Sequence, residues 1–112
     1  MPVHPLETDC RSVHARLVDD DCDLLLLDCR ERDEYELVHV PQSTLVPMSE
    51  IATRVRELDE YREREIAVIC HHGIRSLDVT IWLNQQGFAN VKSVAGGIDR
   101  WAHQIDPAMP RY

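Results

Sequence analysis

Hydrophobic residues along this chain alternate between short apolar runs and longer segments in which they recur periodically. The short runs are bounded by polar or turn-forming residues, and three of the four are rich in β-branched side chains, as is typical of strands. These runs occupy residues 24–28, 44–46, 66–70 and 91–94. We therefore predict a strand at each of these four positions.

The segments between these runs carry apolar residues three or four positions apart, which places them on one face of an α-helix. Residue types that favour helix caps stand at several of their ends. The expected helices are one capped by Thr8, a short one over residues 31–38, one capped by Ser49, a well-buried one that starts at Ser76 and stops at Gly87, and one over residues 98–105.

Strand and helix thus alternate four times along the chain. This order favours a parallel sheet, because each parallel crossover needs a connection of helix length. In such sheets ligands bind beyond the carboxyl ends of the strands. Asp28 and Cys70 each end a predicted strand at that edge, so we expect the functional site there.

In the segment VICHHGIRS, residues 68–76, a buried strand ends on a thiol, and many hydrogen-bond donors come directly after it. Gly73 supplies the conformational freedom that a turn around the Cys70 thiol requires. In that turn, backbone N–H groups and the helix N-terminus would stabilise the thiolate, and Arg75 adds a positive charge suited to an oxyanion. The alternative is that Cys70 is only a small hydrophobic residue. We favour a loop that holds negative charge on or next to one sulfur.

Composition and charge exclude several classes of protein. The 112 residues, 44% hydrophobic and 29% charged, fit one compact domain, and we take residues 1–112 as a single domain. The formal charge of −8, with Lys92 as the only lysine, argues against nucleic acid as a partner. The longest aliphatic run is too short to cross a bilayer, and the first residues lack the pattern of a secretory signal. We therefore expect a cytoplasmic protein with no membrane partner.

The four cysteines are Cys10, Cys22, Cys29 and Cys70. Their spacing contains no CxxC pair, so a structural zinc site has little support, and free thiols are expected in a chain of ordinary apolar content. His71 and His72 adjoin Cys70, but adjacent side chains rarely converge on one ion. We expect no metal and no cofactor.

Three stretches of the sequence together resemble the rhodanese-like sulfurtransferases. CHHGIRS is similar to their active-site loop, C-x-x-G-x-R-S, and DCRERDEYELVHVP resembles their D-x-R-E stretch followed by a His-hydrophobic-Pro element. GFANVKSVAGGIDRW resembles the strand, double-glycine turn and helix that close the family's domain. These elements occur in the family's order over residues 24–107, and their combination is far more specific than any one of them.

The resemblance implies an α/β fold of three layers, in which helices flank both faces of a five-stranded parallel sheet whose first strand lies near residues 3–5. It also implies an enzyme of the thiosulfate sulfurtransferase type. The Cys70 thiolate would take the outer sulfur of thiosulfate or a similar small-molecule donor, hold it as a persulfide, and pass it to cyanide, a thiol or a protein acceptor. The implied substrate-binding loop comprises His71, His72, Gly73, Ile74, Arg75 and Ser76. We expect a monomer or a weak homodimer.

Other residues near the predicted site keep two interpretations each. Asp28 either joins Arg30 in orienting the loop or caps the turn after the strand, and we favour a supporting structural role. His71 and His72 either tune donor preference at the mouth of the pocket or are solvated and silent.

The sequence also departs from the family's pattern at three positions. Val38 and Gln42 stand where glycines usually flank the His-hydrophobic-Pro element, and Cys29 stands where an aliphatic residue is usual. Cys29 is either a core substitute for valine or a second thiol that could pair with a persulfidated Cys70.

Two rival functions remain open. Cysteine-dependent phosphatases also place a thiolate and an arginine around an anion, but they separate the two by five residues, whereas four lie between Cys70 and Arg75. The tighter ring should suit a single sulfur better than a phosphoryl group. The second rival is a non-enzymatic module that docks a partner or senses redox state, and its plainest sign would have been loss of the cysteine.

Overall fold

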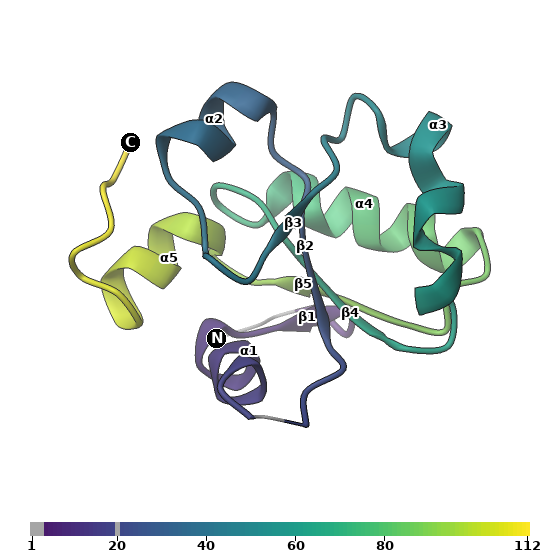
Figure 1. Cartoon of the computed structure of the whole chain (residues 1–112), viewed down its shortest axis with the longest axis horizontal. Coiled ribbons are helices and arrows are strands. Elements are labelled where there is room, and N and C mark those ends of the chain that lie inside the picture. Colours follow the sequence, from purple (N-terminus) through teal and green to yellow (C-terminus); the bar gives the residue numbers. More distant parts are fainter. Residues whose placement is uncertain (1–3, 20) are drawn as a thin grey trace.

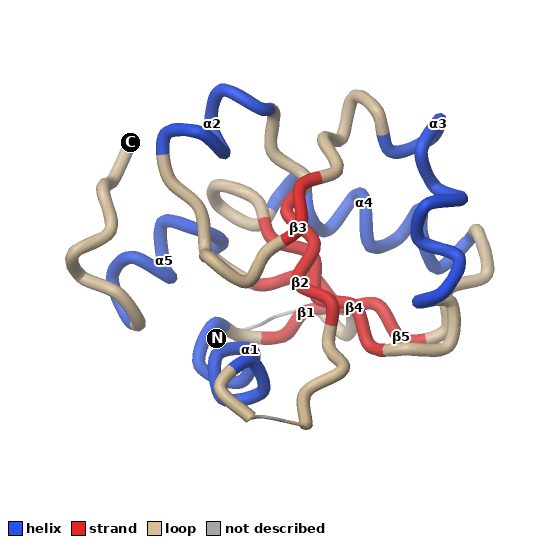
Figure 2. The backbone as a smooth tube through the Cα atoms, in the orientation of Figure 1, coloured by secondary structure: helices blue, strands red, loops and turns tan. Residues whose placement is uncertain are grey.

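Five parallel strands form one sheet in the computed structural model, which describes residues 4–19 and 21–112. They are β1 (Glu7–Thr8), β2 (Leu25–Asp28), β3 (Thr44–Leu45), β4 (Glu65–Ile69) and β5 (Asn90–Val94). The spatial order is β1-β5-β4-β2-β3, and every neighbouring pair is parallel. Figure 2 shows the strands gathered at the centre of the molecule, with the connections around them.

Helices cover both faces of the sheet, as predicted (Figure 1). They are α1 (Cys10–Leu17), α2 (Arg32–Leu37), α3 (Ile51–Arg54), the 3₁₀ helix η1 (Val55–Tyr61), α4 (Ile74–Gln85) and α5 (Gly97–Gln104). Apolar side chains of α3, η1 and α4 pack with Leu25 and Leu27 on one face of the sheet. Those of α1 and α5 pack with Leu26 on the other face. The alternation follows from the two-residue period of a strand, and it explains why Leu25, Leu26 and Leu27 of β2 are all apolar.

The first strand lies later in the chain than residues 3–5. Val3 lies outside the described residues, and His4 and Pro5 form a bend and a turn. Thr8 pairs with Val94 of β5 instead of capping α1, and its carbonyl accepts from the Ala95 N–H at 2.9 Å. The predicted cap was therefore wrong by one residue.

Asp9 is the N-cap of α1, and its carboxylate accepts from the Ser12 N–H at 2.8 Å. Ser49 is likewise not the cap of α3, which begins after Glu50. The Ser49 hydroxyl donates instead to the carboxylate of Glu31, at 2.7 Å. Glu50 is the N-cap residue, so the predicted cap was again wrong by one residue.

The long helix α4 begins at Ile74, two residues before the predicted start, and β4 ends at Ile69, one residue before Cys70. Gly87 follows the helix with φ +95°, consistent with the predicted stop. The helix buries one face only, because Ile74 is 75% and Ile81 36% exposed. The expectation of a well-buried helix was therefore too broad.

Among the described residues, none of the helices has both the length and the apolar character needed to cross a membrane.

Candidate functional site

Two neighbouring strands bring the predicted site residues to the carboxyl edge of the sheet. Asp28, the last residue of β2, lies opposite Ile69, the last residue of β4. Cys70 follows Ile69 directly, and the Cys29 N–H donates to the Ile69 carbonyl at 3.0 Å. Cys29 and Cys70 therefore lie side by side just beyond the strands, within the same buried cluster.

The loop after β4 curls its backbone around the Cys70 sulfur. Gly73, with φ +99°, donates its N–H to Cys70 Sγ at 3.1 Å, and the Ser76 N–H in the first turn of α4 donates at 3.2 Å. Ser76 Oγ lies 3.3 Å from the same sulfur and can donate its hydrogen to a thiolate. Ser93 of β5 supports that hydroxyl, with its own Oγ 2.7 Å away. Three donors and a helix N-terminus thus meet at one sulfur, which favours negative charge there.

The first turn of α5 fixes this loop from the other side. The Ile98 N–H donates to the Cys70 carbonyl at 2.8 Å, and the Asp99 N–H donates to the His71 carbonyl at 3.0 Å. A Cβ on Gly97 would lie 2.2 Å from the Cys70 carbonyl oxygen and 2.6 Å from that of His71. Glycine is therefore required for α5 to approach the loop so closely.

The surroundings of Cys70 lower its pKa to about 5, far below the ordinary value of a thiol. A hydrogen bond from the Cys29 thiol is the largest cause; burial opposes it, and the donors of Ser76 and Gly73 add to it. The pKa of Cys29 moves the other way, raised by its hydrogen bond to Cys70 and by burial. The pair therefore holds a thiolate at Cys70 and a protonated thiol at Cys29 near neutral pH.

The Cys70 sulfur lies at the floor of a small open hollow of about 280 Å³. The residue is only 1% exposed, yet it lines this hollow together with His71, His72, Ile74 and Arg75. Ile74 is largely exposed at this site. The hollow therefore adjoins the sulfur, although little of Cys70 is exposed to solvent.

Arg75 does not present its guanidinium freely to the sulfur, which differs from the sequence-based expectation. Its Nη1 and Nη2 donate to Glu34 Oε2 and Oε1 of α2, each at 2.8 Å. This pair, led by the hydrogen bonds from Arg75, lowers the pKa of Glu34 to about 2. Glu34 is a residue that the sequence reasoning missed, because a carboxylate on a short helix gives no sign of a partner 41 residues away.

Asp28 and Arg30 form a fully buried ion pair behind the site. Arg30 donates through Nε and Nη2 to both Asp28 oxygens, and its backbone N–H donates to Oδ1 at 3.0 Å. Asp28 thus caps the turn after β2. The rest of the guanidinium donates to the Val38 carbonyl at 2.6 Å and to the Tyr112 hydroxyl at 2.8 Å.

Val38 accepts this contact in an extended conformation, with φ −162°. That is a backbone geometry any residue adopts, so the missing family glycine at this position needs no compensation. No residue other than glycine has a positive φ within the described part of the chain, which includes Gln42.

Three rings stack at the mouth of the hollow. The centroid of His71 is 3.9 Å from that of His72 and 3.9 Å from that of Tyr112. His71, His72 and Asp99 also offer one ligand atom each within 4.8 Å of one another, so a divalent ion could be held there. Asp99 is already paired with Arg111 at 2.7 Å, and the expectation of no metal stays a prediction. Tyr112 was missed by sequence reasoning because it lies far along the chain from the loop.

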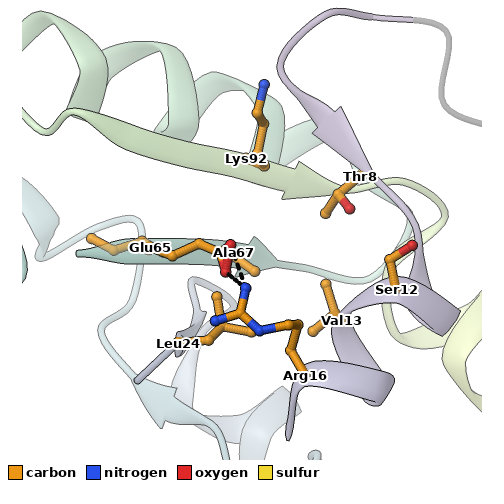
Figure 3. A pocket seen from close by; sticks show the side chains of 9 residues that line it. Thr8, Ser12, Val13, Arg16, Leu24, Glu65, Ala67 and Lys92 are labelled. Atoms are coloured by element: carbon orange, nitrogen blue, oxygen red, sulfur yellow. Dashed lines mark hydrogen bonds and ion pairs between the residues drawn. The ribbon is translucent and has the colours of Figure 1, made fainter. Parts of the chain in front are cut away.

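A second cavity, of about 410 Å³, lies at the opposite end of β4 (Figure 3). Arg16 of α1 reaches across it to the carboxylate of Glu65, the first residue of β4. Its lining holds no cysteine or histidine, so it offers no nucleophile of the kind found at Cys70.

Comparison with known proteins places these features in a family. Residues 11–104 match the family model described as the rhodanese-like domain. A protein of Allochromatium vinosum named sulfurtransferase is 34% identical over 103 residues, which cover 92% of this chain and 94% of that protein. YrkF of Bacillus subtilis, named as a candidate sulfur carrier, is 40% identical over 89 residues. That alignment covers 80% of this chain but 47% of YrkF, so the chain spans about half the length of that relative.

Solved structures agree with the sequence comparison. The rhodanese-related protein of Thermoplasma volcanium has a TM-score of 0.77 at 28% identity, covering 88% of this chain and 92% of that one. A human single-domain sulfurtransferase gives a TM-score of 0.77 at 19% identity, over 90% of this chain and 98% of that one, which supports the fold alone. The match over most of the chain and the shared fold show that this chain belongs to the rhodanese-like domain family.

Proposed function

We propose that this chain is a sulfurtransferase, a single rhodanese domain that carries sulfane sulfur on Cys70. The Cys70 thiolate attacks the outer sulfur of thiosulfate or a similar donor. The sulfur–sulfur bond of the donor breaks, and sulfite leaves with the electron pair, so that Cys70 becomes a persulfide. Cyanide, a thiol or a protein acceptor then attacks the terminal sulfur and takes it, which restores the Cys70 thiolate.

The observation that carries this proposal is the set of donors at one sulfur. Two backbone N–H groups lie within hydrogen-bond distance of Cys70 Sγ, at 3.1 and 3.2 Å, in a pocket of about 280 Å³. Preorganised donors of this kind stabilise a thiolate before the attack and an anionic persulfide after it. The four free cysteines suit a reducing compartment such as the cytoplasm, where thiols persist.

Incubation with thiosulfate followed by intact-protein mass spectrometry tests the proposal. We expect the wild-type mass to rise by one sulfur atom, cyanide to remove that sulfur as thiocyanate, and Cys70→Ser to gain nothing. Cys22→Ala, which removes a partly exposed cysteine elsewhere, is the control and should load like the wild type. A wild-type protein that never gains sulfur would support a docking or redox-sensing module instead.

Phosphoryl transfer is the weaker candidate. Glu34 occupies both terminal nitrogens of Arg75, the group that a phosphoryl dianion would need. We expect negligible hydrolysis of an aryl phosphate under conditions in which thiocyanate forms, and the reverse pattern would favour the phosphatase.

A further inference from the structure

The hollow above the reactive sulfur contains little positive charge. Its lining residues are Cys70, His71, His72, Ile74 and Arg75, of which only Arg75 is permanently cationic. The two histidines carry no permanent charge, and the His71 ring is stacked between His72 and Tyr112. The charge that a donor meets therefore depends on what Arg75 is already bound to.

Arg75 is bound to the carboxylate of Glu34, and both oxygens of that carboxylate accept further hydrogen bonds. Glu34 Oε2 accepts from Arg75 Nη1 at 2.8 Å and from the Glu31 N–H at 3.0 Å. Glu34 Oε1 accepts from Arg75 Nη2 at 2.8 Å and from the Tyr112 hydroxyl at 3.2 Å. Both oxygens are thus fully engaged in a bidentate pair of the strongest geometry that arginine forms.

Further contacts link the Arg75–Glu34 pair to the residues that line the hollow. Arg30 donates to the Tyr112 hydroxyl at 2.8 Å and is itself fixed on the buried Asp28. The Tyr112 ring lies on His71, one of the residues that line the hollow. The side chains of Arg75 and Glu34 are only 34% and 20% exposed, so the pair is more than a loose surface contact.

We propose that Glu34 is a built-in counter-ion to Arg75 and so determines which donor charge the site prefers. The site then favours sulfane-sulfur donors with one negative charge over the dianion thiosulfate. This inference rests on the proposed sulfur transfer at Cys70. Among the charged side chains at and beside the hollow, a donor approaching the thiolate meets the negative charges of Cys70 and Glu34 and the single permanent positive charge of Arg75. Each additional negative charge on the donor is therefore disfavoured. Glu34 touches no reacting atom and acts through Arg75, as a positioning residue.

Two donors of similar size separate the effect of charge from that of chemistry. Thiosulfate carries two negative charges, and the methanethiosulfonate anion, in which a methyl group replaces one oxygen, carries one. In each case the thiolate attacks the outer sulfur and the sulfur–sulfur bond breaks. Sulfite or methanesulfinate leaves with the electron pair, and the same persulfide forms on Cys70.

Glu34→Gln removes the counter-ion while keeping the size of the side chain and an oxygen that can accept from the Glu31 N–H. We expect the rate of Cys70 loading by thiosulfate, divided by that for methanethiosulfonate, to rise about tenfold. Glu57→Gln is the matched control, because Glu57 also pairs with an arginine, Arg54 at 3.0 Å, but on the exposed surface of η1. Its donor ratio should stay at the wild-type value.

A measurement on the wild type alone covers the case in which Glu34→Gln does not fold. Each loading rate is divided by the rate at which a small thiolate in solution reacts with the same donor. We expect the protein to accelerate loading by methanethiosulfonate more than loading by thiosulfate.

A greater acceleration for thiosulfate, an unchanged ratio in Glu34→Gln, or an equal rise in Glu57→Gln would overturn the role of Glu34. Failure of both donors to add sulfur to Cys70 would instead overturn the sulfurtransferase proposal.

Discussion

At the scale of single residues, the proposed sulfur chemistry involves a pair of neighbouring cysteines. Cys70 holds the negative charge because Cys29, Ser76 and Gly73 donate to its sulfur, and the Cys29 thiol is the largest cause of the lowered pKa. The valine-like interpretation of Cys29 explains its complete burial but not this contact. We therefore predict that Cys29 also stabilises the Cys70 thiolate.

Cys29→Ala should raise the pKa of Cys70 from about 5 toward the ordinary range of a thiol, because the strongest donor to the thiolate is lost. The rate of Cys70 alkylation as a function of pH measures this directly, with Cys22→Ala as the control. Below the new pKa the variant should react more slowly than the wild type. An unchanged alkylation profile would mean that the loop donors alone hold the charge.

At the scale of the elements, the turn between β5 and α5 decides whether the loop can form. A Cβ at Gly97 would overlap two backbone carbonyls of the loop, and its φ of +58° adds strain for any other residue. Gly97→Ala should therefore cost about 2–4 kcal/mol in the free energy of unfolding.

Urea denaturation tests this cost, and Gly87→Ala supplies a matched comparison. Gly87 also has a positive φ, +95°, but the nearest atom to its added Cβ is a flexible Arg62 nitrogen at 3.3 Å. We expect a smaller cost there, of about 1 kcal/mol. Equal costs at the two glycines would show that backbone strain, and not the contact with the loop, sets the effect.

Sequence patterns located most of these elements because each relies on local periodicity. The strands around Leu26 and Val68 were predicted within one residue, since apolar runs between turn residues report burial directly. The caps at Thr8 and Ser49 were each wrong by one residue, and both residues instead contact partners distant in sequence. The double-glycine turn was recognised only through the family resemblance. Its contact with the loop could not be predicted from the sequence.

In the candidate site, too, the features that are local in sequence were predicted and the distant contacts were not. Cys70 and the loop donors follow from a strand, a glycine and a helix start that are contiguous in sequence. Glu34 and Tyr112 were missed because they join Arg75 and Arg30 across 41 and 82 residues, and no periodicity encodes such contacts.

At the scale of the whole molecule, the shifted pKa values make folding stability depend on pH. The folded-state pKa of Cys70 lies near 5, below its unfolded value of 9.0, so between these limits the unfolded chain binds more protons. The free energy of unfolding that Cys70 contributes is thus present at high pH and is lost as pH falls from about 9 to 5. Glu34 adds a second loss between about 4.5 and 2.

Thermal unfolding as a function of pH checks this expectation. Between pH of about 6 and 8, where Cys29 stays protonated, the wild-type melting temperature should rise with pH more steeply than that of Cys70→Ser. Parallel curves for the two proteins would mean that Cys70 has the same pKa in the folded and unfolded chains.

The most direct measurement for the whole account is a titration of the Cys70 thiolate itself. The ultraviolet absorbance of thiolates is recorded across the pH range, and the curve of Cys70→Ser is subtracted from that of the wild type. We predict a midpoint near 5, so that the sulfur is ionised at neutral pH. A midpoint near 9, the ordinary value for a cysteine, would contradict the claim that this loop holds a reactive thiolate.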